Sequence, residues 1–120
     1  MTATQEVGTT AALAQWAAGF RLDAAPPEVV ERMKALVLDF CRVVAIGARL
    51  PWSRSARQLT LELGGSGRSS VLLYGDRLDA ARAAFVNGAF AHACDIDDTH
   101  VGSMHHAGAS ILPEIGRAHV

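Results

Sequence analysis

Apolar residues recur at helical spacing over the first half of the chain. Trp16 and Phe20 lie four positions apart on one apolar face of TAALAQWAAGF, which predicts a first helix over residues 5–20. The segment DAAPP ends this helix, because a proline disfavours the α conformation at the residue before it. A second helix is predicted over residues 27–49, where a leading proline suits the first turn and the apolar residues share one broad face.

The second half of the chain continues this pattern with one interruption. The segment WSRSARQLTLEL predicts a third helix over residues 52–63, and an alanine-rich run predicts a fourth over residues 79–94. Between them, the apolar segment SVLLYG is compatible with one short strand near residues 70–74. Gly88 costs about 1 kcal/mol relative to alanine inside a helix, which predicts close backbone packing there. The predicted fold class is mostly α, in one domain or part of one.

Composition and charge narrow the class of protein. Half of the 120 residues are apolar, which is enough for one hydrophobic core of ordinary domain size. The net charge is -1 and the arginines are scattered, so we expect no nucleic-acid partner. No apolar run approaches the ~20 residues that cross a bilayer, and the chain does not start with a signal peptide. We therefore expect a cytoplasmic protein with no membrane partner, in which Cys41 and Cys94 are buried thiols.

Most of the histidine is concentrated in HACDIDDTHVGSMHH, residues 92–106, which we call the histidine loop; it holds four of five histidines and three of seven aspartates. A metal site is one interpretation, since His92 and Asp95 would share a helix face and suit zinc, iron or manganese. However, the chain has neither H-E-x-x-H nor C-x-x-C, and the adjacent Asp97 and Asp98 would point in different directions. We therefore expect no metal.

Two other interpretations of the histidine loop remain open from the residues alone. Asp97, Asp98 and Thr99 are good helix caps and turn formers, which favours a purely structural role for the two aspartates. Four histidines in 15 residues are a poor way to make a turn, however, and histidine suits proton transfer near neutral pH. A carboxylate, a hydroxyl and an imidazole on one glycine-containing loop form a plausible acid/base set.

A longer stretch around the histidine loop, FVNGAFAHACDIDDTHVGSMHHAGASILP at residues 85–113, resembles the signature of the MmgE/PrpD family. That family includes 2-methylcitrate dehydratases, cis-aconitate decarboxylases and an iminodisuccinate epimerase. The signature combines N-G, a histidine, D-x-D-D with serine or threonine, and a histidine six residues beyond the hydroxyl residue. The matching residues are Asn87, Gly88, His92, Asp95, Asp97, Asp98, Thr99 and His105. His106 departs from the pattern, because many members carry proline at that position.

The resemblance implies a fold and an activity. Residues 1–113 would be the N-terminal part of the family's all-helical domain. The protein would be a lyase or isomerase without metal or organic cofactor, most similar to 2-methylcitrate dehydratases, and a homodimer at full length. Its shared chemical step would make or protonate a carbanion next to a carboxylate of a small polycarboxylate, which leaves dehydration, decarboxylation and epimerisation open. The alternative is a non-catalytic helical module that binds a partner through apolar faces.

The resemblance also implies roles for particular residues. His105 would perform acid/base catalysis, Thr99 would hydrogen-bond a substrate carboxylate, and Asp95 would orient an imidazole or share a proton. His92 and His100 would join Thr99 in binding the substrate. None of these five residues is expected to hold a metal.

The charge of the histidine loop indicates that this site needs other residues. The loop has three aspartates and no lysine or arginine, which disfavours binding a polycarboxylate. The resemblance implies that a lysine and further histidines come from later in a chain several times longer. The segment EIGRAHV, residues 114–120, back-translates to GAGATCGGAAGAGCACACGTC, which contains a common sequencing adapter. We therefore expect residues 114–120 to be a non-native tail and the 120 residues alone to be inactive.

Overall fold

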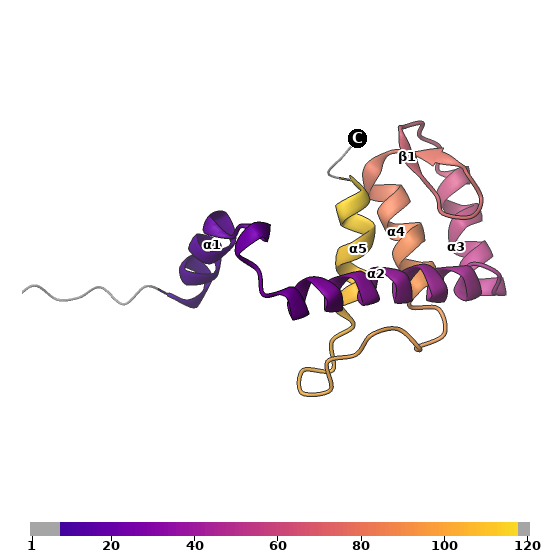
Figure 1. The fold of residues 1–120 in the computed structure, drawn as a ribbon. Coiled ribbons are helices and arrows are strands. Elements are labelled where there is room, and N and C mark those ends of the chain that lie inside the picture. Colours follow the sequence, from indigo (N-terminus) through magenta and orange to yellow (C-terminus); the bar gives the residue numbers. More distant parts are fainter. Residues whose placement is uncertain (1–7, 118–120) are drawn as a thin grey trace, which may run out of the picture. The chain divides into compact units, whose positions relative to one another are not determined.

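The structure, a computed structural model, describes residues 8–117 and is mostly helical (Figure 1). Its elements are α1 (Thr9–Gly19), a 3₁₀ helix η1 (Leu22–Ala24), α2 (Pro27–Gly47), α3 (Pro51–Glu62), β1 (Ser69–Ser70), β2 (Arg77–Leu78), α4 (Ala80–Ala91) and α5 (Ala107–Arg117). The mostly α fold class is confirmed. The four predicted helices correspond to α1 through α4, although residues 5–7 of the first prediction lie outside the described residues.

The chain divides into two compact units, residues 1–31 and residues 32–120. In the described part of the first unit, no residue of α1 is buried, and the rings of Trp16 and Phe20 lie against each other with centroids 5.3 Å apart. The second unit contains most of α2 and every later element, including the histidine loop. The second unit holds the candidate site.

The core of the second unit forms where the C-terminal half of α2 meets α4 and the hairpin of β1 and β2. Its least exposed large residues are Phe40, Val43, Val44, Val71, Leu78, Val86 and Phe90. Val86 and Phe90 are fully buried, so α4 is the central helix of this unit. Gly47 of α2 lies so close to α4 that an added Cβ would collide with the carbonyl oxygen of Phe90.

Helix α5 lies beside α4 (Figure 1). A Cβ on Gly88 would lie 3.1 Å from the carbonyl oxygen of Ala109 on α5, which is closer than ordinary van der Waals contact. This geometry confirms the predicted close packing at Gly88. Pro113 lies inside α5 and has no N–H to donate back to the Ala109 carbonyl. The carbonyl oxygen of Ala109, which approaches Gly88, therefore lacks the N–H donor that an α-helix usually supplies four residues later.

Helix α5 is not among the helices predicted from the sequence. Its apolar residues Ile111, Leu112 and Ile115 do repeat at helical spacing. This spacing begins within the family signature, residues 85–113, and continues two residues beyond it. The helix extends through residue 117 and so includes the first part of the segment 114–120. The expectation that this segment is a non-native tail stays a prediction, and residues 118–120 lie outside the described residues.

The hairpin of β1 and β2 replaces the single strand predicted near residues 70–74. The two strands pair antiparallel, but the chain turns directly after β1, and Leu73 adopts a left-handed φ of 67°. Val71 is 1% exposed in the core, and the hydroxyl of Tyr74 donates to the carbonyl oxygen of Ala48 at 2.9 Å. The apolar residues of this segment therefore anchor a turn to the core rather than extend a strand.

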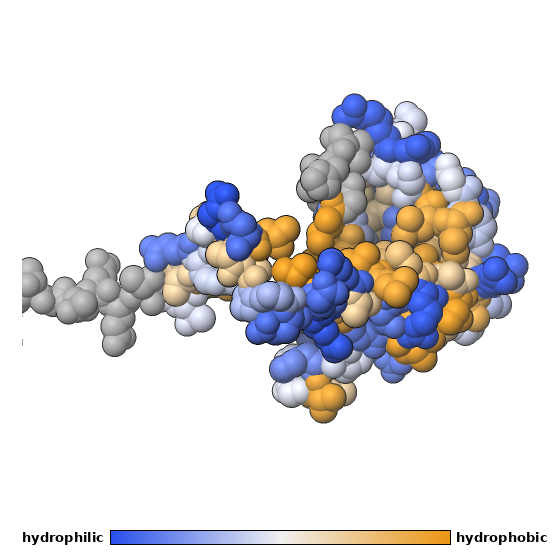
Figure 2. Space-filling model, viewed as in Figure 1, coloured by the Kyte–Doolittle hydropathy of each residue, from blue (hydrophilic) through white to orange (hydrophobic). Residues whose placement is uncertain are grey.

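Several large apolar side chains of the second unit remain at the surface, and Figure 2 shows them around α2. Val37 is 45% exposed and Leu38 is 72% exposed. The expectation that both cysteines are buried is wrong for Cys41, which lies beside the buried residues of α2 and is exposed. Cys94 is partly exposed, and both thiols are free. No helix in the described part of the chain is long and apolar enough to cross a membrane.

Candidate functional site

The histidine loop connects α4 to α5, and two neighbouring helices anchor its first half. The guanidinium of Arg42 on α2 donates to the carbonyl oxygen of Ile96 at 3.1 Å. The indole N–H of Trp52 on α3 donates to the carbonyl oxygen of Ala93 at 3.2 Å. Both donors bind backbone atoms, so they set the path of the loop rather than the chemistry of its side chains. The sequence patterns did not identify either anchor, because both depend on contacts between distant segments.

Asp98 holds the other end of the loop against α5. Its carboxylate accepts hydrogen bonds from the backbone N–H of Gly108, with oxygen distances of 3.0 Å and 3.2 Å. A carboxylate in this place satisfies a free N–H of the first helical turn and interacts favourably with the helix dipole. A Cβ at Gly108 would collide with this carboxylate, so the close approach needs glycine. This geometry agrees with the structural role favoured for Asp98.

Asp97 is the centre of the site. Its side chain is 2% exposed and lies between two imidazoles. Nδ1 of His92 is 3.0 Å from Oδ1 and 3.2 Å from Oδ2, and Nδ1 of His106 is 3.3 Å from Oδ2. The two rings are themselves in contact, with centroids 4.5 Å apart. A buried charge needs such partners, because leaving it without hydrogen bonds would cost several kcal/mol.

Thr99 and Asp95 complete this arrangement on the side of His106. The hydroxyl of Thr99 donates to the carbonyl oxygen of Asp97 at 3.2 Å and lies 3.3 Å from Nδ1 of His106. Oδ1 of Asp95 lies 3.5 Å from Nε2 of the same imidazole, a distance that suits an ion pair. Asp95 is 78% exposed and has a left-handed φ of 54°, which aspartate tolerates better than most residues. We call His92, Asp95, Asp97, Thr99 and His106 the carboxylate cluster.

The predicted residues His100 and His105 occupy a different place, the tip of the histidine loop. The backbone N–H of His100 donates to the carbonyl oxygen of His105 at 2.9 Å, and Met104 turns the chain with φ 51°. Nδ1 of His100 contacts the hydroxyl of Ser103 at 2.8 Å. Within the described residues, no hydrogen bond or ion pair joins the side chain of His105 to the carboxylate cluster.

The structure thus brings together three of the five predicted site residues and adds two others. His92, Asp95 and Thr99 belong to the carboxylate cluster, whereas the roles of His100 and His105 stay predictions. The added residues are Asp97, which was assigned a structural role, and His106, which was assigned none. The signal that could have identified His106 is its departure from the proline common in the family.

The carboxylate cluster also contains the ligand types of a metal site. One ligand atom from each of His92, Asp95, Asp97 and His106 can be chosen so that all four lie within 4.8 Å of one another. Nδ1 of His92 lies at hydrogen-bond distance from the Asp97 carboxylate, and Nδ1 of His106 lies at an ion-pair distance from it. The expectation that the cluster holds no metal stays a prediction.

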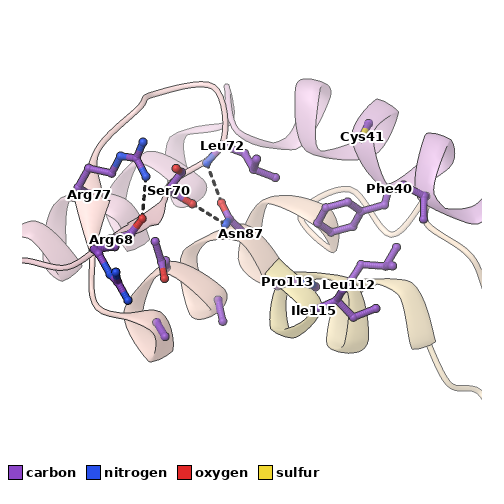
Figure 3. Close-up of a pocket in the computed structure, with 15 residues that line it drawn as sticks. Phe40, Cys41, Arg68, Ser70, Leu72, Arg77, Asn87, Leu112, Pro113 and Ile115 are labelled. Carbon is purple, nitrogen blue, oxygen red and sulfur yellow. Dashed lines mark hydrogen bonds between the residues drawn. The ribbon is translucent and has the colours of Figure 1, made fainter. Parts of the chain in front are cut away.

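Asn87 of the signature has a clear structural role elsewhere. A groove of about 740 Å³ lies between α2, the hairpin, α4 and α5. Figure 3 shows Asn87 in the lining of this groove, with its side chain pointing at the backbone of the hairpin. Its Oδ1 accepts from the N–H of Leu72 at 2.9 Å, and its Nδ2 donates to the carbonyl oxygen of Ser70 at 3.0 Å. The rest of the groove is lined mainly by apolar residues, among them Phe40 and Leu112, and the histidine loop does not contribute to it.

Three curated proteins that match this chain carry the name cis-aconitate decarboxylase or cis-aconitate decarboxylase-like protein. Over 108 residues the chain is 36% identical to a cis-aconitate decarboxylase of Aspergillus terreus (strain NIH 2624 / FGSC A1156). This match covers 90% of the present chain and 22% of the relative. A second cis-aconitate decarboxylase of Aspergillus terreus is 35% identical with the same coverage. The cis-aconitate decarboxylase-like protein oryM of Aspergillus oryzae (strain ATCC 42149 / RIB 40) is 31% identical over 112 residues, or 93% of this chain and 23% of the relative. No solved structure gave a significant match.

The chain therefore spans between a fifth and a quarter of the length of these curated relatives, at 22% to 23%. The profile of the MmgE/PrpD N-terminal domain matches residues 11–116, which includes the whole histidine loop. Because this match covers most of the chain and contains the signature whose geometry is described above, the chain belongs to the MmgE/PrpD family.

Proposed function

We propose that the full-length protein is a cofactor-independent lyase or isomerase that acts on a small polycarboxylate. The observation that carries this proposal is the carboxylate cluster, in which the signature residues Asp95 and Thr99 lie beside two imidazoles. Such a set offers a hydrogen-bond donor and proton-transfer groups within a few ångströms. The names of the relatives support the same class of activity, since they describe decarboxylases of a tricarboxylate.

The shared chemistry would be the formation or protonation of a carbanion next to a carboxylate. In a dehydration, a base takes the proton from the carbon, and an acid protonates the leaving hydroxyl so that water departs. In a decarboxylation, the carbon–carbon bond breaks, carbon dioxide leaves, and the electron pair on carbon takes a proton from an acid. Either route needs an imidazole that can change roles, and we assign this role to His105, as the family resemblance implies. Asp95, whose carboxylate lies beside the imidazole of His106, would orient an imidazole or share a proton. Thr99, His92 and His100 would bind the substrate carboxylates.

Substrate choice within this class is a finer part of the proposal. The family resemblance favours a 2-methylcitrate dehydratase, whereas the relatives that match carry the name cis-aconitate decarboxylase. Both substrates are tricarboxylates. With neutral imidazoles the carboxylate cluster is anionic, so it would repel such a substrate unless cations approach from other parts of the full-length protein. We therefore expect the residues that bind most of the substrate charge to lie outside this chain, and the protein to work as a homodimer.

The direct test is turnover of cis-aconitate and of 2-methylcitrate by the full-length protein, followed by proton NMR. We expect one of them to be converted, and His105→Ala and Asp95→Asn to lower kcat/KM about 100-fold or more. Glu62→Gln on the exposed surface of α3 is the matched control and should leave kcat/KM unchanged. The 120-residue chain alone should convert neither substrate.

The alternative is a non-catalytic helical module, and the exposed apolar residues of α2 are the feature that would serve it. Failure of the full-length protein to convert either substrate, combined with a stable complex lost in Leu38→Asp, would favour this alternative. Conversion that survives both site substitutions would show that the assigned residues are wrong while the activity is right.

A further inference from the structure

The segment around Ile96, between the two aspartates Asp95 and Asp97, has few hydrogen bonds of its own. Within the described residues, none of residues 96–99 takes part in a backbone–backbone hydrogen bond. Asp95 has a left-handed φ of 54°, a conformation that costs free energy for a residue with a side chain. Such a conformation persists where the surrounding structure holds it, so contacts from other elements have to hold this segment.

Arg42 provides such a contact from α2. This helix passes the end of α4 from which the histidine loop leaves (Figure 1), and Nη2 of Arg42 donates to the carbonyl oxygen of Ile96 at 3.1 Å. A charged donor binds a carbonyl oxygen more strongly than a neutral donor does. Because the peptide group is planar, holding this oxygen also sets the direction in which the chain enters Asp97.

Asp39 holds the guanidinium that makes this contact. Oδ1 of Asp39 accepts from Nε of Arg42 at 2.9 Å and lies 2.8 Å from Nη2. The two residues are one turn apart on α2, so the guanidinium is tied to the helix on one side and to the loop on the other. The side chains of Asp39 and Arg42 are 33% and 50% exposed, and an ion pair this exposed adds little to stability. Its consequence is therefore geometric, because it directs one N–H at the loop.

This geometry bears on the site because Ile96 separates two members of the carboxylate cluster. The directions of the Asp95 and Asp97 side chains depend on the backbone dihedrals on either side of the Ile96 carbonyl group. A displacement of about 1 Å in the groups of a site can lower a rate about 100-fold. A contact that fixes this backbone therefore acts on turnover without touching the substrate.

We propose that Arg42, held by Asp39, is a positioning residue that sets the two aspartates of the carboxylate cluster through the carbonyl group of Ile96. Within the described residues, no hydrogen bond or ion pair joins the Arg42 side chain to a side chain of the cluster, so its action is indirect. Arg42 lies 54 residues before Ile96 and outside the signature segment. The contact itself follows from the geometry, whereas its effect on turnover rests on the proposed function.

The contact is tested on the 120-residue chain by NMR of ¹³C- and ¹⁵N-labelled protein. Arg42→Met keeps an unbranched side chain but removes the donors, so we expect the ¹³C resonance of the Ile96 carbonyl to move upfield as it loses its hydrogen bond. The amide resonances of residues 95–98 should shift with it, whereas those of the hairpin at residues 69–78 should not. Arg32→Met, at an exposed arginine of the same helix, is the matched control and should leave the Ile96 carbonyl unchanged. An unchanged Ile96 resonance in Arg42→Met would overturn the proposal.

The effect on turnover is tested in the full-length protein with cis-aconitate and 2-methylcitrate, at a temperature at which circular dichroism shows each variant to be folded. In Arg42→Met we expect kcat to fall about 10-fold or more while KM changes less than about threefold. Asp39→Ala, which frees the guanidinium, should cause a smaller loss of kcat. Asp39→Asn should change kcat less than about twofold, because Oδ1 alone makes both contacts and the amide oxygen can take its place.

The outcomes separate the positioning role from the proposed function. An unchanged kcat in Arg42→Met, together with a shifted Ile96 resonance, would overturn the positioning role and leave the proposed function standing. A raised KM at unchanged kcat would also overturn it, because that result would indicate direct binding of the substrate. If Arg42→Met does not fold, Asp39→Ala decides the same question with the guanidinium still present. Absence of turnover in the unmodified full-length protein would overturn the proposed function and the effect on turnover together, while the NMR result would still decide the contact.

Discussion

Two loops of the second unit are each organised by one buried polar side chain, and the two side chains differ in kind. Asn87 is 7% exposed and holds the hairpin by two hydrogen bonds to backbone atoms. Asp97 is 8% exposed as a whole residue and holds the histidine loop by contacts with two imidazoles. One residue thus fixes a loop through neutral backbone groups, and the other through groups that can gain or lose a proton.

This difference separates a structural loop from a chemical one. A neutral amide bound to backbone atoms gives geometry that does not depend on protonation, and it offers no group for catalysis. A carboxylate bound to imidazoles costs more to bury, but it leaves two ring nitrogens oriented and available. Both residues belong to the same family signature, so a signature position by itself does not distinguish the two roles.

The largest effect should come from removing the amide that holds the hairpin. Asn87→Ala would leave the N–H of Leu72 and the carbonyl oxygen of Ser70 without partners. Because each unsatisfied group costs roughly 1–3 kcal/mol, we expect the free energy of unfolding to fall by about 2–3 kcal/mol. Urea denaturation of the 120-residue chain measures this loss, and a change below about 0.5 kcal/mol would mean that water replaces both bonds.

Removing the charge that holds the histidine loop should have a smaller effect on stability. In Asp97→Asn one imidazole loses its acceptor, but His92 is half exposed and can turn to water. We therefore expect a loss of about 1 kcal/mol. Amide hydrogen exchange should become faster over residues 92–106 and stay unchanged over residues 69–78. Equal acceleration in both segments would show that the two loops are not organised independently.

The hairpin should also have one pH-dependent contact, the ion pair between Arg57 on α3 and Asp76. The guanidinium of Arg57 donates to both carboxylate oxygens at 2.5 Å and 2.8 Å, and this hydrogen bonding lowers the pKa of Asp76 below its usual 3.8. A lowered folded-state pKa gives stability that is fully present above pH 3.8 or so and is lost as the pH falls through the lowered value.

We expect this pair to contribute about 1 kcal/mol near neutral pH, since both side chains are only partly exposed. Thermal denaturation between neutral pH and about pH 2 measures the loss. Arg57→Met is the matched control, because it keeps an unbranched side chain near the Tyr74 ring, 4.2 Å from the Arg57 guanidinium, but removes the charge. Its acid-induced loss of stability should be smaller than that of the unmodified chain, and an identical loss would contradict the assignment.

The smallest effect should come from the tip of the histidine loop. The side chain of His105 is exposed, and the tip is held by backbone hydrogen bonds to His100. We therefore expect His105→Ala to change the free energy of unfolding by less than about 0.5 kcal/mol. The same substitution should lower turnover strongly in the full-length protein. A large loss of stability would indicate a structural role for His105 instead.

The sequence predicts the helices well because their information is local. Apolar spacing and prolines place α1 through α4, and the glycine inside α4 correctly predicts a close backbone approach. The hairpin is less predictable, because Val71 and Tyr74 have the composition of a strand but pack into a turn. Helix α5 is not predicted although its apolar spacing is regular, because it is short and contains Pro113, a residue that disfavours a helix interior.

What the sequence determines by itself is the family, the mostly helical fold class and the segment that carries the chemistry. Which side chains of that segment meet is decided only by the tertiary structure. Asp98 and Gly108 place the start of α5, and the left-handed turn at Met104 sends His105 to the loop tip and His106 to Asp97. Two adjacent histidines thus have different environments, because their directions depend on backbone dihedrals and on a helix cap between Asp98 and Gly108, which are ten residues apart in sequence.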